Sequence, residues 1–75
     1  MKLWYVVAVE PKEGDSYINV FGPFLSRRDA RRYAVEVDED NGWLSVKAKS
    51  MTAEEAASLA TDYILWPYDS KPGGQ

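Results

Sequence analysis

The chain of 75 residues contains neither cysteine nor histidine. Without cysteine it can form no disulfide and no thiolate metal site, which fits a reducing cytoplasm. Without histidine it lacks the usual zinc ligand and the usual general base near neutral pH. We therefore expect a cytoplasmic protein that holds no metal and no cofactor.

Long apolar runs, catalytic motifs and an excess of positive charge are missing too. No apolar run approaches the roughly 20 residues of a membrane span, and Leu3–Val9 is too short and too rich in β-branched residues for a signal peptide. We find no nucleophile elbow and no phosphate-binding glycine loop, so we do not expect an enzyme. A net charge of -3 disfavours general attraction to nucleic acid or to anionic lipid.

The length allows one domain, which we place at residues 1–68, and a chain this short buries only about 60% of its unfolded surface. Two stretches of this domain predict neighbouring strands. Lys2–Glu10 is apolar on both faces, as in a central strand that is covered on both sides. Tyr17–Phe21 has strand periodicity, and we expect it to pair antiparallel with the first strand across a polar connection, Pro11–Ser16.

The residues after the second strand predict a turn and then a helix. Gly22 and Pro23 should end the strand, because proline has no amide N–H with which to continue a ladder. Ser26 can then cap a helix that runs from about Arg27 to Glu39. Leu25, just before the cap, can pack onto the helix as a hydrophobic staple.

The second half of the chain predicts a third strand, Trp43–Lys49, whose lysines suit an exposed edge. A second helix should follow a capping box at residues 52–55, and Tyr63–Trp66 is a candidate for a short fourth strand. Residues 69–75 should form a flexible tail. We therefore predict a small α+β domain, β-β-α-β-α, with a three-stranded sheet of order 2-1-3 and helices packed on it.

The turn before the first helix resembles a known pattern. Gly22-Pro23-Phe24, Ser26, Ala30 and Ala34, within residues 17–34, resemble the Gly-Pro-Phe-x-Ser-x-x-x-Ala pattern in the second half of SPOR domains. They are also similar to small uncharacterised proteins common in actinobacteria and their phages. The first resemblance implies glycan binding at cell-wall peptidoglycan outside the membrane. The second implies no particular activity, and it is compatible with a phage accessory protein that acts on a host protein.

All four arginines of the chain lie at the start of the predicted first helix, and its other end is acidic. They are Arg27, Arg28, Arg31 and Arg32. A helix dipole favours the opposite arrangement, and each misplaced exposed charge costs roughly 0.3–1 kcal/mol. The cluster favours a site for an anion or for a partner's carboxylates. The alternatives are a solvated helix face whose arginines pair with acids elsewhere in the chain, and nucleic-acid or other polyanion binding, for which no motif is present.

Three tryptophans and five tyrosines are many for so small a core. Tryptophan and tyrosine are enriched in interface hot spots, and Trp66 with Tyr68 is the best candidate for an exposed cluster. The alternative is that the rings supply bulk to the core. A homodimer through an apolar sheet face is a natural variant.

One acidic stretch, Asp38–Gly42, partly matches a calcium loop but lacks its further ligands, so we interpret it as an acidic helix end. Taken together, the patterns favour a non-catalytic protein-binding module with an unidentified protein partner. The candidate partner-binding residues are Arg27, Arg28, Arg31, Arg32, Trp66 and Tyr68.

Overall fold

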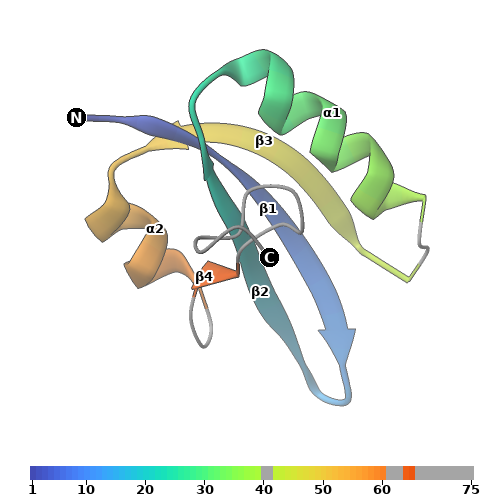
Figure 1. Cartoon of the computed structure of the whole chain (residues 1–75). Helices are drawn as coiled ribbons and strands as arrows, with labels where there is room; N and C mark the ends of the chain where they lie inside the picture. Colours follow the sequence, from blue (N-terminus) through green and yellow to red (C-terminus); the bar gives the residue numbers. More distant parts are fainter. Residues whose placement is uncertain (40–41, 61–63, 66–75) are drawn as a thin grey trace.

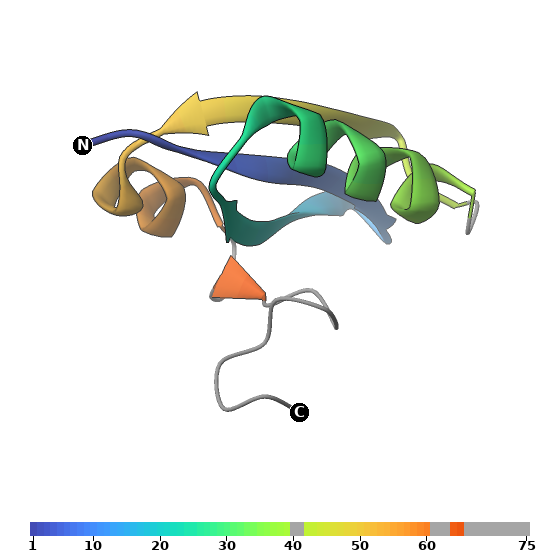
Figure 2. The same cartoon turned by 45° about the horizontal axis from the view of Figure 1, so that its top comes forward.

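The computed structural model describes residues 1–39, 42–60 and 64–65. In chain order the elements are β1 (Leu3–Lys12), β2 (Asp15–Phe24), α1 (Arg27–Asp38), β3 (Ser45–Met51), α2 (Ala53–Leu59) and β4 (Ile64–Leu65) (Figure 1). The sheet order is β3-β1-β2-β4, so that β3 and β4 lie at opposite edges (Figure 2). β1 is antiparallel to β2 and to β3, whereas β4 is parallel to β2. The predicted α+β class and the order 2-1-3 are confirmed, and β4 is the short fourth strand.

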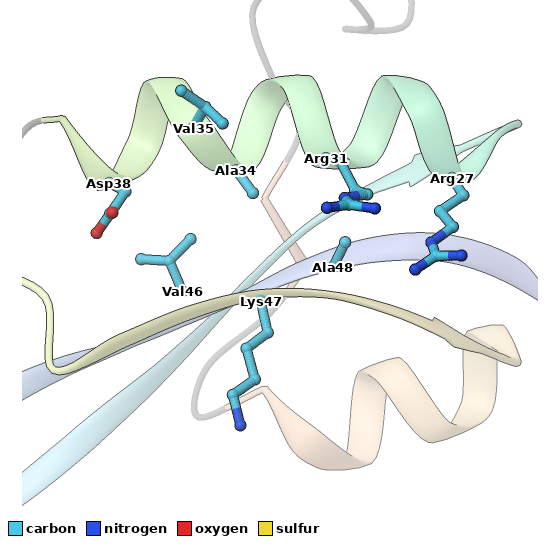
Figure 3. Close-up of a pocket in the computed structure, with 8 residues that line it drawn as sticks. All are labelled: Arg27, Arg31, Ala34, Val35, Asp38, Val46, Lys47 and Ala48. Atoms are coloured by element: carbon cyan, nitrogen blue, oxygen red, sulfur yellow. The ribbon is translucent and has the colours of Figure 1, made fainter.

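The two helices cover opposite faces of the sheet. Adjacent residues of β1 point to opposite faces: Tyr5 packs in a cluster with Ala56 of α2, and Val6 packs with Ala30 of α1. Figure 3 shows α1 and α2 on the two sides of β3. The connection through α1 crosses the sheet from β2 to β3, and the connection through α2 crosses back from β3 to β4. Connections between parallel strands of one sheet are right-handed. Because these two connections run across the sheet in opposite directions, the same hand places their helices on opposite faces.

The hairpin between β1 and β2 is tighter than predicted. Lys12 pairs with Asp15, so only Glu13–Gly14 remains as a turn, with Gly14 at a φ of 75°. Two-residue hairpin loops require positive φ angles, which glycine adopts readily. The predicted polar connection Pro11–Ser16 was therefore too long, because its polarity reflects an exposed hairpin end rather than the absence of strand pairing.

The end of β2 is the main departure from the prediction. The strand continues through Gly22–Pro23, joined by a cis peptide bond, to Phe24, so the predicted end of the strand at this dipeptide was wrong. Val6 pairs with Phe21 and Trp4 pairs with Phe24, which leaves one extra residue in β2. Such a bulge shifts the alternation of side chains. As a result both phenylalanines of this segment lie in the cluster under α1.

α1 is fixed to this bulged segment by an aromatic contact and by its cap. The ring centroid of Tyr33 lies 5.5 Å from that of Phe21 and 5.5 Å from that of Phe24. The hydroxyl oxygen of Ser26 accepts the backbone N–H of Asp29 at 3.1 Å, as expected of an N-cap. The residue that precedes the cap, Leu25, is 87% exposed, so the predicted hydrophobic staple was wrong.

α2 begins with the predicted capping box. The Thr52 hydroxyl accepts the backbone N–H of Glu55 at 3.1 Å, and the Glu55 carboxylate accepts the backbone N–H of Thr52 at 2.8 Å. β3 starts at Ser45, two residues later than predicted, and Leu44, which belonged to the predicted strand, precedes it and is 66% exposed. In the part of the chain that the structure describes, no helix is long and apolar enough to cross a membrane.

Candidate functional site

A groove of about 390 Å³ runs between α1 and β3 (Figure 3). Its lining includes both the first and the last residue of α1, so it follows the whole helix, about 18 Å at 1.5 Å per residue. The lining residues are Arg27, Arg31, Ala34, Val35, Asp38, Val46, Lys47 and Ala48. The groove is therefore elongated, with α1 as one wall and the edge strand β3 as the other.

The apolar floor of the groove comes from small side chains. Val46 and Ala48 point from β3 toward α1, where Ala34 faces them, while Lys47 points to the opposite side of the sheet (Figure 3). This alternation follows from the period of a β-strand. With alanine on both walls, helix and strand meet without filling the space between them.

One end of the groove is cationic. Arg27 and Arg31 stand one helical turn apart, both exposed, and their guanidinium groups turn toward β3 (Figure 3). The Arg27 guanidinium carbon lies 5.9 Å from the centroid of a Trp4 ring, a distance typical of a cation–π contact that holds the arginine over β1. Within residues 1–39, 42–60 and 64–65, no carboxylate lies within the 4.0 Å of a salt bridge from either arginine.

The other end of the groove is anionic. Asp38, the last residue of α1, lines it, and Glu39 follows as the exposed helix cap. The groove is thus electrostatically polarised along its length, with positive charge beside the helix N-terminus and negative charge beside the C-terminus. Among the described residues there is no group of three or more acidic, histidine or cysteine side chains that could hold a metal ion. Part of the acidic stretch Asp38–Gly42, residues 40–41, lies outside the described residues.

The structure separates the four arginines into two pairs. Arg27 and Arg31 line the groove, whereas Arg28 and Arg32 do not. Because successive helical residues are rotated by about 100°, the second pair lies on the face of α1 that is turned to solvent, and both of its members are exposed. The predicted site is therefore brought together only in part, and Trp66 and Tyr68 lie outside the described residues.

Comparisons with known proteins yielded no relative of this chain. A scan against protein-family models found no match, and searches of curated proteins and of solved structures found none either. The similarity to SPOR domains and to small phage proteins therefore rests on residues 17–34 alone and stays a prediction.

The described aromatic rings chiefly build the core. Phe21 contacts Tyr33 and, at 6.5 Å between ring centroids, Trp43. The Trp43 indole N–H is buried and has no hydrogen-bond partner among the described residues. Tyr5 is 1% exposed on the α2 face. For these rings the core interpretation holds, and Trp4 adds a second role as the support of Arg27.

Sequence reasoning missed most of the groove walls. Val35 and Asp38 continue the row of Arg27 and Arg31 along α1, at steps of four and three residues. This spacing could have been recognised once the helix was predicted. The groove residues of β3 could not have been recognised from the sequence, because their place depends on which flank of α1 faces the edge strand.

Proposed function

We propose that this protein is a non-catalytic protein-binding module whose partner occupies the groove between α1 and β3. The observation that carries the proposal is the polarised groove, with two arginines at one end, an acidic side chain at the other and an apolar floor between them. Sites for small molecules enclose most of the ligand surface. A groove that follows an entire helix suits a segment of protein chain instead, and an apolar centre with a charged rim is typical of protein interfaces.

Arg27 is the expected anchor of the interface. Arginine is enriched in interface hot spots, and a side chain that is already oriented loses less conformational freedom on binding. The contact with Trp4 supplies such an orientation. We therefore expect a carboxylate of the partner at the end formed by Arg27 and Arg31, and a neutral or basic group beside Asp38. Binding would act by occluding a surface of the partner, which would be a host protein if the chain is a phage accessory protein.

The test is capture of the partner by the tagged full chain from extracts of the native host, with and without nuclease, read by mass spectrometry. The groove variant carries Arg27→Glu and Arg31→Glu. The control variant carries Arg28→Glu and Arg32→Glu, which has the same net charge on the same helix but leaves the groove unchanged. We expect a partner in near-stoichiometric amount that resists nuclease, is lost with the groove variant and is retained by the control.

Other outcomes would refute the proposal. Binding through general polyanion attraction would collapse with nuclease, fall steeply with salt and weaken alike in both double variants, because it depends on the number of positive charges and not on their place. Sedimentation with purified peptidoglycan, without a protein partner, would favour the glycan binding implied by the SPOR resemblance.

A further inference from the structure

We propose that the partner contributes an extended acidic segment, which adds to the sheet as a strand beside β3 and lies along the groove. This inference rests on the proposed function and specifies the chemistry of its partner. It is carried by two observations together: β3 is an edge strand, and cations flank that edge on both faces of the sheet.

The edge of β3 offers a row of backbone groups. β3 pairs with β1 on one side over all seven of its residues, and on its other side no strand is found in the part of the chain that the structure describes. In an antiparallel pair every second residue directs its N–H and C=O away from the partner strand. These groups can pair with an added strand, the mode known as β-augmentation. β4 at the opposite edge has only two residues, so β3 is the longer edge.

Positive charge flanks this edge on both faces. On one face Arg27 and Arg31 overhang the groove, and on the other Lys47 points away from α1 (Figure 3). Lys49 lies on this second face too, because it lines a pocket with Glu55 and Leu59 of α2, and both lysines are exposed. Side chains of an added strand would alternate in the same way. Those facing α1 would meet the arginines and the exposed Val35, and those facing the other side would lie beside the lysines.

Among the residues that line the groove, three are cationic, Arg27, Arg31 and Lys47, and one is acidic, Asp38. Asp38 stands at the far end of the groove, and on the α2 side Glu55 lines a pocket together with Lys49. Since opposite charges on neighbouring strands stabilise pairing and like charges oppose it, the edge selects an acidic strand. Its acids should lie beside Ala48, near the arginines, rather than beside Val46, near Asp38 (Figure 3).

A second copy of the chain fits this edge less well. Pairing of β3 with β3 of another molecule in antiparallel orientation would bring the lysines of the two copies together. Lysine on an edge strand is a recognised device against such edge-to-edge association. The length also suits a short segment: the roughly 18 Å of α1 correspond to about five residues of extended chain.

The experiment uses the isotope-labelled full chain and synthetic peptides of seven residues, the length of β3. One peptide alternates two glutamates with two valines, so that glutamates fall on both faces of the added strand, and its counterpart has lysine in place of glutamate. We expect the acidic peptide to bind and to slow hydrogen exchange at alternate amides of β3 by about tenfold or more near saturation. The double variant Lys47→Glu, Lys49→Glu should weaken this binding by about tenfold, whereas the Arg28→Glu, Arg32→Glu control should not.

Three results would overturn the inference. The first is binding of the acidic peptide without protection of β3 amides, and the second is equal or stronger binding of the lysine peptide, or no binding of either. The third is a dimer of the parent chain in sedimentation equilibrium whose formation slows hydrogen exchange at alternate amides of β3, since that would make a second copy the occupant of the edge. In each case the proposed function is decided separately by the capture experiment, because that experiment depends on Arg27 and Arg31 and does not require an extended partner.

Discussion

Replacing Gly22 by alanine tests whether the bulge in β2 is built as described. Gly22 has a φ of 144°, which residues with a side chain rarely adopt. A Cβ atom placed there would lie 2.8 Å from the Cδ2 atom of Tyr5 and 3.1 Å from the backbone oxygen of Trp4. Neither can yield easily, since one is backbone and the Tyr5 ring is only 1% exposed within the α2-side cluster.

The cost has three parts. The unfavourable backbone conformation contributes about 1–3 kcal/mol, and overpacking a filled core contributes about 1–3 kcal/mol. Alanine also restricts the unfolded chain, which returns about 0.4–1 kcal/mol. We therefore expect Gly22→Ala to lower the free energy of unfolding by about 1–5.6 kcal/mol. This is a large share of the roughly 4–11 kcal/mol typical of a domain of this size.

Gly14→Ala is the matched control. Gly14 also has a positive φ, 75°, but no atom lies within 4 Å of the position of its Cβ. Gly14→Ala should therefore cost only the about 1–2 kcal/mol of the left-handed backbone conformation. The restriction of the unfolded chain by alanine offsets part of this cost. Urea unfolding followed by tryptophan fluorescence measures both variants against the parent chain. A Gly22→Ala variant no less stable than Gly14→Ala would refute the described packing of Tyr5 on the bulge. Replacing Tyr5 by leucine should relieve part of the penalty in a double-mutant cycle.

Further predictions concern the groove and the cap of α2. Val35→Glu should abolish capture of the partner while changing stability by no more than about 0.5 kcal/mol, because Val35 lines the groove and is 59% exposed; thermal melts check the second part. Thr52→Ala should destabilise the fold by about 1 kcal/mol in urea, since it removes one half of the capping box. The hydrogen bond from the Thr52 backbone N–H lowers the pKa of Glu55 below its ordinary value of 4.5. Ionised Glu55 therefore stabilises the fold above about pH 4.5, and this stabilisation is lost as the pH falls through the lowered folded-state pKa. Thermal melts of Glu55→Gln over the same pH range should not show this loss.

Elements whose signals are local could be predicted well. The two helix caps at Ser26 and Thr52 lie where the sequence placed them, because the capping residue and its target are only three positions apart. The central position of β1 followed from its two apolar faces. The bulge could not be predicted in this way, since Gly22–Pro23 has the composition of a strand end and only pairing with β1 shows that the strand continues.

The candidate site was predicted in part for the same reason. The arginine cluster is visible in the sequence, but its division into a groove pair and a solvent pair depends on which side of α1 faces β3. Leu25 and Leu44 show the limit of polarity patterns, because both are apolar residues at element ends that the fold leaves exposed. An apolar residue is informative about the core only when its neighbours in space are known.

The opposite placement of the two helices bears on the order in which the chain folds. The core layer under α1 is formed mainly by residues of the first 38 positions, in which β1, β2 and α1 are connected by a two-residue turn and a short link at Leu25. The core layer under α2 instead packs Tyr5 against residues far along the chain, Met51 and Ala56. Contacts between residues close in sequence form with less loss of chain entropy. The hairpin and α1 should therefore be largely formed in the folding transition state, with α2 docking afterwards. Replacing the buried Ala30 by a larger residue should then chiefly slow folding, and replacing the buried Ala56 by a larger residue should chiefly accelerate unfolding.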